Sequence, residues 1–564
     1  MERKNILITV LFLFSFLSVF WVVSVENSFS FDDVAWLQIV STSSYGELFS
    51  FFPHSTYLDR PVGVMFLKLL YETFRLDYSR HHTVLVIIHL ANVFLAFLMG
   101  KSILRRKWKN EEENTRGGVI AAGFFGIWSR SHMAIWWDAA IFDLLGTMWS
   151  FLSVFFYFRY RNNVKYKRTN LLFLLLFYYL AIRTKEMFLI LPVLFALFET
   201  WEMFLEKKRK SFTIGTKMST VVLALFLGML FYFKFSENGG VTNDINSVYY
   251  QSFHPVKLVQ SLLKYCMLCF DLQNGGWIYY AVSVSGLIGT IVLGGGCIIS
   301  IVIAVIRKNV DFLLCYLAIG VSISTVLPMI NRAHVLYLYF PAIFVGLLFA
   351  VVVVKLNLHD IILVIILGLF LLTAQASGNV RTREDWLANA KYEKRAWDDI
   401  GKIAAPMPGT TIYIKDLGDK EYTPFFYGDG AVCKLLYDDA SLKIQILRDN
   451  DWNEIAYSEP YIVWEYCDGQ IKEIERNNNS VLMIEEIYQY AQEDGSLLLG
   501  IVPNRISDPM KIYVNEFRTK AVIGETFISA QIPAEIIEGK EAVALRLEDA
   551  WGLGEEYVMA IENR

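Results

Sequence analysis

Residues 82–104 read HTVLVIIHLANVFLAFLMGKSIL, and Arg105, Arg106 and Lys107 follow directly. An α-helix needs about 20 mostly apolar residues to cross the roughly 30 Å hydrocarbon core of a bilayer, and this stretch provides them. The whole chain of 564 residues is 55% hydrophobic and 15% aromatic, with a mean hydropathy of +0.39. This composition does not fit a soluble protein and predicts an integral membrane protein.

The same criterion predicts eleven membrane-spanning helices. Their approximate ranges are 5–25, 82–104, 117–130, 138–158, 169–183, 186–204, 216–234, 278–306, 311–328, 335–355 and 359–376. The first could instead be a cleaved signal peptide. Its apolar run is long for one, however, and no small-residue cleavage site closes it.

Charge predicts the orientation of these helices. Basic clusters follow the second, fourth and sixth segments, at 105–107, 159–168 and 207–210. Because Lys and Arg at helix ends stay in the cytoplasm, the N-terminus is expected inside and the region after residue 376 outside. Residues 378–564 carry 34 acidic and 20 basic residues (−14), which leaves 22 acidic and 32 basic residues (+10) before them. The total of −4 argues against a nucleic-acid binder.

Charged and aromatic side chains gather at the predicted external helix ends. The loop 28–80, after the first segment, contains two acidic motifs, and three further spots occur where later helices re-enter the bilayer. Each could be simple interfacial anchoring or a solvated loop. Acids and bases together at membrane depth are nevertheless expected where a polar reaction meets a lipid-borne anion. The candidate residues are Asp32, Asp33, Asp59, Arg60, Trp137, Asp143, Arg183, Lys185, Glu186, Arg332, His334 and Tyr337.

The order of these motifs resembles that of the GT-C glycosyltransferases, membrane enzymes that take a sugar from a polyprenyl-phosphate carrier at the outer or lumenal face. Phe31-Asp32-Asp33 is similar to the acidic motif in the first external loop of protein O-mannosyltransferases, and Arg60-Pro61 to a motif later in that loop.

Three later stretches look like motifs of the transmembrane and tetratricopeptide-type mannosyltransferases. They are residues 134–145 with Trp137 and Asp143, Lys185-Glu186 with Pro192, and residues 332–341. The resemblance covers about the first 376 residues. It departs from the family at 128–133, which lack the proline and glutamate of the pattern, and no 34-residue repeat follows.

The resemblance implies a polytopic α-helical enzyme of GT-C type that uses a polyprenyl-phosphate sugar, undecaprenyl-linked in a bacterium. Asp32, or alternatively Asp33, would be the catalytic base. Arg332 would bind the donor phosphate, followed by Arg60, Lys185 and Arg183. Asp59, Asp143, Glu186, Trp137, His334 and Tyr337 would position the substrates. A one-step displacement would invert the sugar.

The expected partners are the lipid-linked donor, a glycan, lipid or protein acceptor, and membrane lipids. No cofactor is expected. Asp32, Asp33 and Asp59 could form an oxygen site for Mg²⁺ or Mn²⁺, but they lack a strong ligand spacing and the resembled enzymes work without metal.

The region after the last segment predicts two external modules. Residues 377–490 predict a small α/β module, with strands at 410–415 and 461–466 and a helix at 431–437. Residues 491–564 predict an antiparallel, immunoglobulin-like β-sandwich. Its strands are expected at 497–502, 511–514, 526–532, 542–547 and 557–561. These modules could recognise a glycan or serve as a lid or spacer, and Cys433 and Cys467 could form a disulfide.

A lipid-linked glycan transporter or flippase is the alternative interpretation. It would place ionisable residues on broken helices near the middle of the bilayer. The break at 294–296, a run of three glycines, favours it. The charges at segment ends favour the transferase. A non-catalytic scaffold is a third interpretation.

Overall fold

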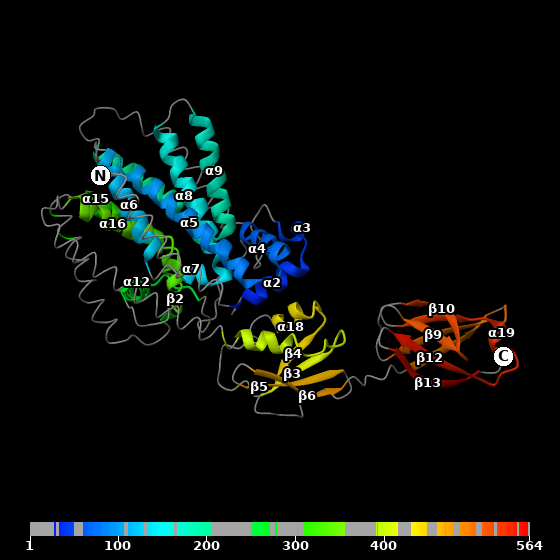
Figure 1. The fold of residues 1–564 in the computed structure, drawn as a ribbon. Coiled ribbons are helices and arrows are strands. Elements are labelled where there is room, and N and C mark those ends of the chain that lie inside the picture. The colour runs from blue at the N-terminus through cyan, green and yellow to red at the C-terminus, as the bar shows by residue number, and fades with distance from the viewer. Residues whose placement is uncertain are drawn as a thin grey trace. The chain divides into compact units, whose positions relative to one another are not determined.

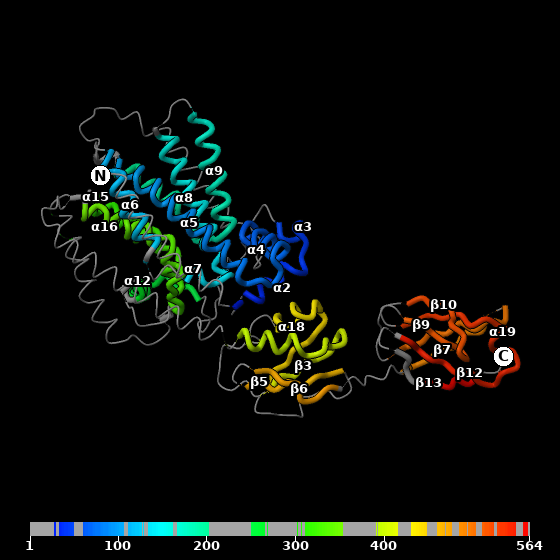
Figure 2. Tube along the Cα trace, in the orientation of Figure 1, coloured from blue at the N-terminus to red at the C-terminus, as the bar shows by residue number. Residues whose placement is uncertain are grey.

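The structure is a computed structural model of the chain, drawn as a ribbon in Figure 1 and traced as a tube in Figure 2. It describes residues 28–29, 33–49, 60–105, 111–128, 133–162, 166–205, 250–270, 277–278, 302, 306, 310–355, 391, 393–415, 430–447, 460–467, 470–477, 484–492, 494–503, 510–523, 527–549 and 552–561. The chain divides into two compact units. One comprises 1–405, 417–444 and 466–472, and the other 406–416, 445–465 and 473–564.

The first unit is mainly helical. Short helices form the first loop, and longer helices follow and pack side by side, α5 against α6 and α8, and α8 against α9 (Figure 1). The helices are α2 (Asp33–Thr42), α3 (Tyr45–Leu48), α4 (Pro61–Phe74), α5 (Tyr78–Leu104), α6 (Glu111–Ile127), α7 (Met133–Trp136), α8 (Ile141–Asn162), α9 (Lys167–Thr184), α10 (Leu191–Leu205), α12 (Pro255–Phe270), α15 (Val310–Ile323) and α16 (Ala342–Lys355).

Two helices of the described residues, Tyr78–Leu104 and Asp138–Arg161, are long and apolar enough to cross a membrane. Asp311–Ile323 and Ala342–Val353 are shorter apolar helices. The predicted spans at 5–25, 216–234 and 359–376, and nearly all of 278–306, lie outside the described residues. The total of eleven spans therefore stays a prediction.

Two predicted spans begin with a 3₁₀-helix before the α-helix. Residues 186–190 form the 3₁₀-helix η4 before α10, and 335–338 form the 3₁₀-helix η7 before α16. Proline explains both starts. Pro192 and Pro341 lie at or just before the first turns of α10 and α16, where the missing backbone N–H costs nothing, although it would interrupt a longer helix.

A mixed four-stranded sheet follows the helical region. Its order is β4-β3-β5-β6, and β3 runs parallel to β5 with Thr411 opposite Tyr461. The strands predicted at 410–415 and 461–466 and the helix predicted at 431–437 are confirmed. The elements are β3 (Thr411–Lys415), α18 (Ala431–Leu436), β4 (Lys443–Ile446), β5 (Tyr461–Cys467) and β6 (Gln470–Asn477).

The C-terminal residues form one antiparallel sheet of seven strands, in the order β13-β12-β9-β10-β11-β8-β7. Its elements are β7 (Ile484–Ala491), β8 (Leu497–Pro503), β9 (Lys511–Val514), β10 (Phe517–Ile523), β11 (Ile528–Ile532), α19 (Ala534–Ile537), β12 (Ala542–Asp549) and β13 (Gly552–Ala560). Alternate residues of β8, β9, β11 and β12 form its buried core.

The predicted antiparallel pairing is confirmed, but the two-sheet sandwich was wrong. Residues 517–519 of β10 pair with β9, and residues 520–523 of the same strand pair with β11. Because one strand serves both halves, the sheet is continuous and forms a half-barrel around one core. Cys433 and Cys467 are free thiols, so the disulfide that the sequence left open is absent.

Candidate active site

A buried ion pair joins two of the predicted residues. Lys185 Nζ lies 2.7 Å from both carboxylate oxygens of Asp143. The two side chains are 6% and 3% exposed. Burial lowers the pKa of Lys185 below its ordinary value, although the carboxylate of Asp143 favours the ammonium form. The pair is therefore held in a region where charge is costly and electrostatic interactions are strong.

A second ion pair begins at the next residue of the chain. Arg60 donates from Nε to Glu186 Oε2 at 2.9 Å and from Nη2 to Glu186 Oε1 at 2.6 Å. This two-bond arrangement is the strong, directional form of a charged hydrogen bond. The side chains are 30% and 44% exposed, so solvent reaches this pair. Although burial opposes charge, Glu186 raises the pKa of Arg60 above its ordinary value.

Backbone conformation separates the two pairs. Lys185 has φ −158° and ψ 134°, an extended residue between the end of α9 and η4. Successive side chains of an extended backbone point to opposite sides. Lys185 and Glu186 therefore reach different partners, one buried and one partly exposed, from adjacent positions.

Phe142 holds the surrounding elements together. The Cζ atom of Arg60 lies 5.5 Å from the centre of its ring. A Cβ atom on Gly63 would lie 2.3 Å from Phe142 Cδ1, so only glycine lets α4 approach the ring this closely. Trp36 of α2 packs on the same ring with the centroids 4.9 Å apart. Asp143 follows Phe142 directly, so this packing also fixes the buried carboxylate.

Aromatic rings and a neutral histidine lie near Lys185. The Nζ atom of Lys185 is 4.9 Å from the centre of the Tyr337 ring. The His334 ring lies 6.3 Å from Tyr337 and 5.9 Å from Trp137. Burial, with the charges of Arg332 and Lys185, lowers the pKa of His334 well below its ordinary value. The structure thus brings four predicted residues into the neighbourhood of the buried ion pair: Trp137, Arg332, His334 and Tyr337.

Two-residue strands fix the position of His334. β2 (Ala333–His334) pairs antiparallel with β1 (Trp277–Ile278), with Trp277 opposite His334. The Nδ1 atom of His334 accepts a 3.2 Å hydrogen bond from the Leu336 amide. The histidine therefore caps η7, the turn that carries Tyr337.

Asp33, the first residue of α2, is 1% exposed. Its Oδ1 atom accepts a 2.6 Å hydrogen bond from the backbone N–H of Ala139. Ala139 belongs to the short helix η3 (Asp138–Ala140), which leads into α8 and Asp143. Asp33, the alternative base, and the buried ion pair are therefore held by one segment, residues 137–143.

Sequence reasoning missed a further buried pair in this segment. His81 Nδ1 and Asp138 Oδ2 are 3.2 Å apart, and both side chains are at most 1% exposed. Next to it, the carbonyl oxygen of Trp136 accepts hydrogen bonds of 2.9 Å from the Tyr78 hydroxyl and from His82 Nε2. The available signal was the His81-His82 doublet at the start of an apolar helix. These contacts tie α5 to the segment that holds Asp33.

The remaining predicted residues are placed differently. Asp32 and Asp59 lie outside the described residues. Arg183 is 1% exposed, in the last turn of α9, and bonds to Tyr179 one turn earlier. Among the described residues, no group of three or more His, Cys, Asp or Glu side chains is arranged to hold a metal ion.

Comparison with known proteins finds a distant structural likeness. The chain is similar to two crystal structures of ArnT from Cupriavidus metallidurans, one bound to undecaprenyl phosphate and one in the apo state. Both are 13% identical with a TM-score of 0.43. The matches cover 81% and 83% of this chain, and 93% and 94% of the ArnT chain. No protein-family model and no curated protein matches the sequence. A likeness this distant does not show a shared activity.

Proposed function

We propose that the protein is a GT-C-type glycosyltransferase. It would transfer a sugar from a polyprenyl phosphate to an acceptor at the extracytoplasmic face of a membrane. The observation that carries the proposal is the meeting of a carboxylate and two basic side chains at one segment. Asp33 bonds to residue 139, Lys185 bonds to residue 143, and Arg60 lies against residue 142.

The departing phosphate requires positive charge. A phosphate takes hydrogen bonds best from guanidinium and ammonium donors in a region of low dielectric constant. Among the described residues, Glu186 engages Nε and Nη2 of Arg60, which leaves Nη1 for another anion. Arg60 is also partly exposed, so a ligand can reach it. Arg332 and Lys185 would add further positive charge.

The acceptor requires a base. Asp33 would remove the proton of the acceptor hydroxyl, and the hydroxyl oxygen would form a bond to the anomeric carbon. The bond between that carbon and the phosphate oxygen would break, and its electron pair would leave with the phosphate. The proton would end on Asp33. The Ala139 hydrogen bond orients the carboxylate for this step. Asp32, which the resemblance favours as the base and which lies outside the described residues, is the alternative in this proposal. A single displacement would invert the sugar.

Label transfer tests the proposal. Membranes containing the protein would be incubated with undecaprenyl phosphate linked to a radiolabelled hexose, and label in the acceptor fraction would be counted. We expect Asp33→Asn to lower the transfer rate by about 100-fold or more, the usual contribution of a general base. The control is Asp77→Asn, a partly exposed acid that caps α5 and pairs with Arg80 at 3.0 Å. We expect this control to transfer label as the wild type does.

Three other results would count against parts of the proposal. Loss of transfer in Asp32→Asn with normal transfer in Asp33→Asn would move the base by one residue. Normal transfer in both variants would exclude the first-loop carboxylates. Movement of the labelled lipid across the bilayer without transfer would identify a lipid-linked glycan transporter instead.

A further inference from the structure

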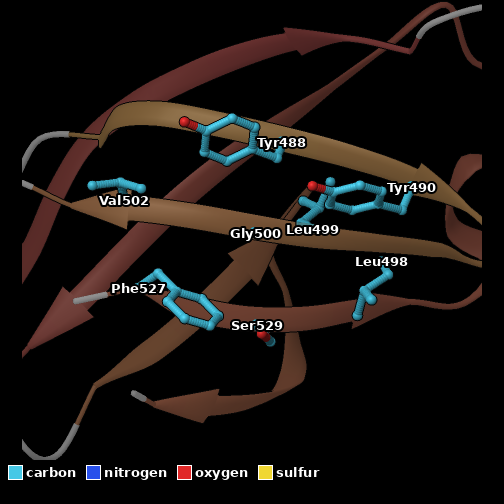
Figure 3. A pocket seen from close by; sticks show the side chains of 8 residues that line it. All are labelled: Tyr488, Tyr490, Leu498, Leu499, Gly500, Val502, Phe527 and Ser529. Carbon is cyan, nitrogen blue, oxygen red and sulfur yellow. The ribbon is translucent and has the colours of Figure 1, made fainter. Parts of the chain in front are cut away.

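The outer face of the seven-stranded sheet carries a groove with a volume of about 530 Å³. It lies over β7, β8 and β11, on the face opposite the buried core. Figure 3 shows Tyr488 and Tyr490 on one side of Gly500, and Phe527 on the other. The complete lining is Tyr488, Tyr490, Leu498, Leu499, Gly500, Val502, Phe527 and Ser529.

The floor of the groove comes from strand register. Tyr488 lies opposite Gly500 on β8, and Gly500 lies opposite Ser529 on β11. One row across β7, β8 and β11 therefore consists of the large ring of Tyr488, then Gly500, which has no side chain, and then the small hydroxyl side chain of Ser529. The next row places Tyr490 opposite Leu498. The missing side chain of Gly500 creates the depression.

The aromatic walls are unusually exposed for their size. Tyr488, Tyr490 and Phe527 are 49%, 56% and 49% exposed. Large apolar side chains that gather around a depression on a solvent-facing sheet are typical of a binding surface. Tyrosines are also rigid side chains that offer an apolar face and a polar tip to a ligand. The hydroxyl of Tyr488 already donates to Glu486, which fixes the ring.

Charge and size narrow the class of ligand. No lining residue is charged, and residues 484–564 carry 15 acidic and 7 basic residues, a net −8. This disfavours phosphate polymers, acidic glycans and anionic lipid headgroups. The volume falls within the range of about 300–1,000 Å³ for small-ligand sites.

We propose that this groove binds a neutral oligosaccharide. A sugar ring has a flat face of C–H groups, which matches the exposed aromatic rings, and an edge of hydroxyl groups. Those hydroxyls can pair with Ser529 and with the tyrosine hydroxyls. Gly500 lets the sugar approach the sheet. The groove needs none of the residues assigned to the transfer reaction, so the inference stands apart from the proposed function.

The test uses the full chain in phosphatidylcholine nanodiscs on an array of neutral and uronic-acid oligosaccharides, four to six sugars long. We expect binding to neutral oligosaccharides, and at least about tenfold weaker binding in Tyr490→Ala, the loss typical of an interface anchor. Phe517→Ala is the matched control, because Phe517 is 64% exposed but does not line the groove. Its binding should equal that of the wild type.

Gly500→Val tests the floor directly. A Cβ atom there would lie 3.6 and 3.7 Å from Tyr488, which is ordinary contact, and β-branched residues favour strands. We expect this variant to keep its thermal stability and lose binding, because the valine fills the depression.

Three outcomes would overturn the proposal. The first is no binding to any neutral oligosaccharide. The second is wild-type binding by both Gly500→Val and Tyr490→Ala. The third is co-flotation with phosphatidylglycerol vesicles that these variants abolish, which would assign the face to lipid. The assay contains no sugar donor, so its failure would leave the proposed transfer untouched, and failure of the transfer would leave the groove untouched.

Discussion

Lys185 and Glu186 are adjacent in the chain, yet their ion pairs differ in energetic character. The Lys185–Asp143 pair is almost fully buried. Removing one partner of such a pair leaves an uncompensated charge in the interior, which is far more costly than losing a surface pair. The Arg60–Glu186 pair is partly exposed, and exposed pairs contribute about 0–1 kcal/mol. The first pair is thus a structural requirement, and the second is available for exchange with a ligand.

We predict that Lys185→Met lowers the free energy of unfolding by about 3–5 kcal/mol, because Asp143 is left buried and unpaired. The double variant Lys185→Met/Asp143→Leu should recover most of that stability, since both charges are gone. It should still fail to transfer label, because in the proposed mechanism Lys185 helps to bind the phosphate. Thermal unfolding in detergent, combined with the transfer assay, separates the two effects.

Arg60→Met is the control for this pair of variants. Its effect on the free energy of unfolding should stay below about 1 kcal/mol, as for an exposed pair. If Lys185→Met/Asp143→Leu were as unstable as Lys185→Met alone, the buried pair of Lys185 and Asp143 would not act as a unit.

At the scale of elements, the packing of α4 on Phe142 positions Arg60. We predict that Gly63→Ala lowers the free energy of unfolding by about 1–3 kcal/mol through overpacking. The added Cβ atom would lie 2.3 Å from the phenylalanine ring. Phe142→Leu should relieve part of this clash, so the double variant should be less destabilised than the sum of the single variants by about 1 kcal/mol.

Gly123→Ala in α6 is the matched control, because nothing lies within 4 Å of the added Cβ atom there. Its thermal unfolding should match or slightly exceed that of the wild type. Strictly additive effects of Gly63→Ala and Phe142→Leu would mean that the contact does not limit the approach of α4.

Sequence patterns predicted these elements unevenly. The apolar runs that became α5 and α8 were clear, because a helix that faces lipid or other helices needs no polar face. Strand β10 was missed because its residues alternate only between exposed and partly exposed. Its sequence, FRTKAVI, also lacks the nearly continuous apolar run LLLGIV by which β8 was recognised. The pairing of β10 with both β9 and β11 could not be predicted from the sequence either, which is why two separate sheets were expected.

The candidate site was likewise predictable only in part. Seven of the predicted residues fall into two groups of contacting side chains. Arg60 pairs with Glu186, and a chain of ion-pair and ring contacts joins Asp143, Lys185, Tyr337, His334 and Trp137. Their partners could not be predicted, since Arg60 and Glu186 are 126 residues apart in the chain. The motifs identify the chemistry of single residues, whereas pairing depends on how the helices pack.

At the scale of the whole molecule, the location of the region after residue 376 remains a prediction from charge. Cys467 in β5 is an exposed free thiol, and Cys433 is buried. We predict that a membrane-impermeant maleimide labels Cys467 in intact spheroplasts, because this region should lie outside the cytoplasm. Mass spectrometry of the labelled peptide checks the result.

Two controls support this measurement. Cys467→Ser should remove the label. A cysteine introduced at Arg105, whose side chain is 71% exposed at the predicted cytoplasmic end of α5, should react only after the membrane is permeabilised. Labelling of that position in intact spheroplasts, without labelling of Cys467, would reverse the predicted orientation.

The single extended residue at 185 also determines how the site responds to its medium. Mobile ions reach Glu186 and Arg60, whereas Asp143 and the Lys185 ammonium are sealed from them. Dissolved salt screens exposed charges over about 10 Å at 0.1 M but acts little on buried ones. Rising ionic strength therefore weakens the Arg60–Glu186 pair and leaves the Lys185–Asp143 pair intact. Two neighbouring residues, 185 and 186, thus give the site one salt-resistant contact and one salt-sensitive contact.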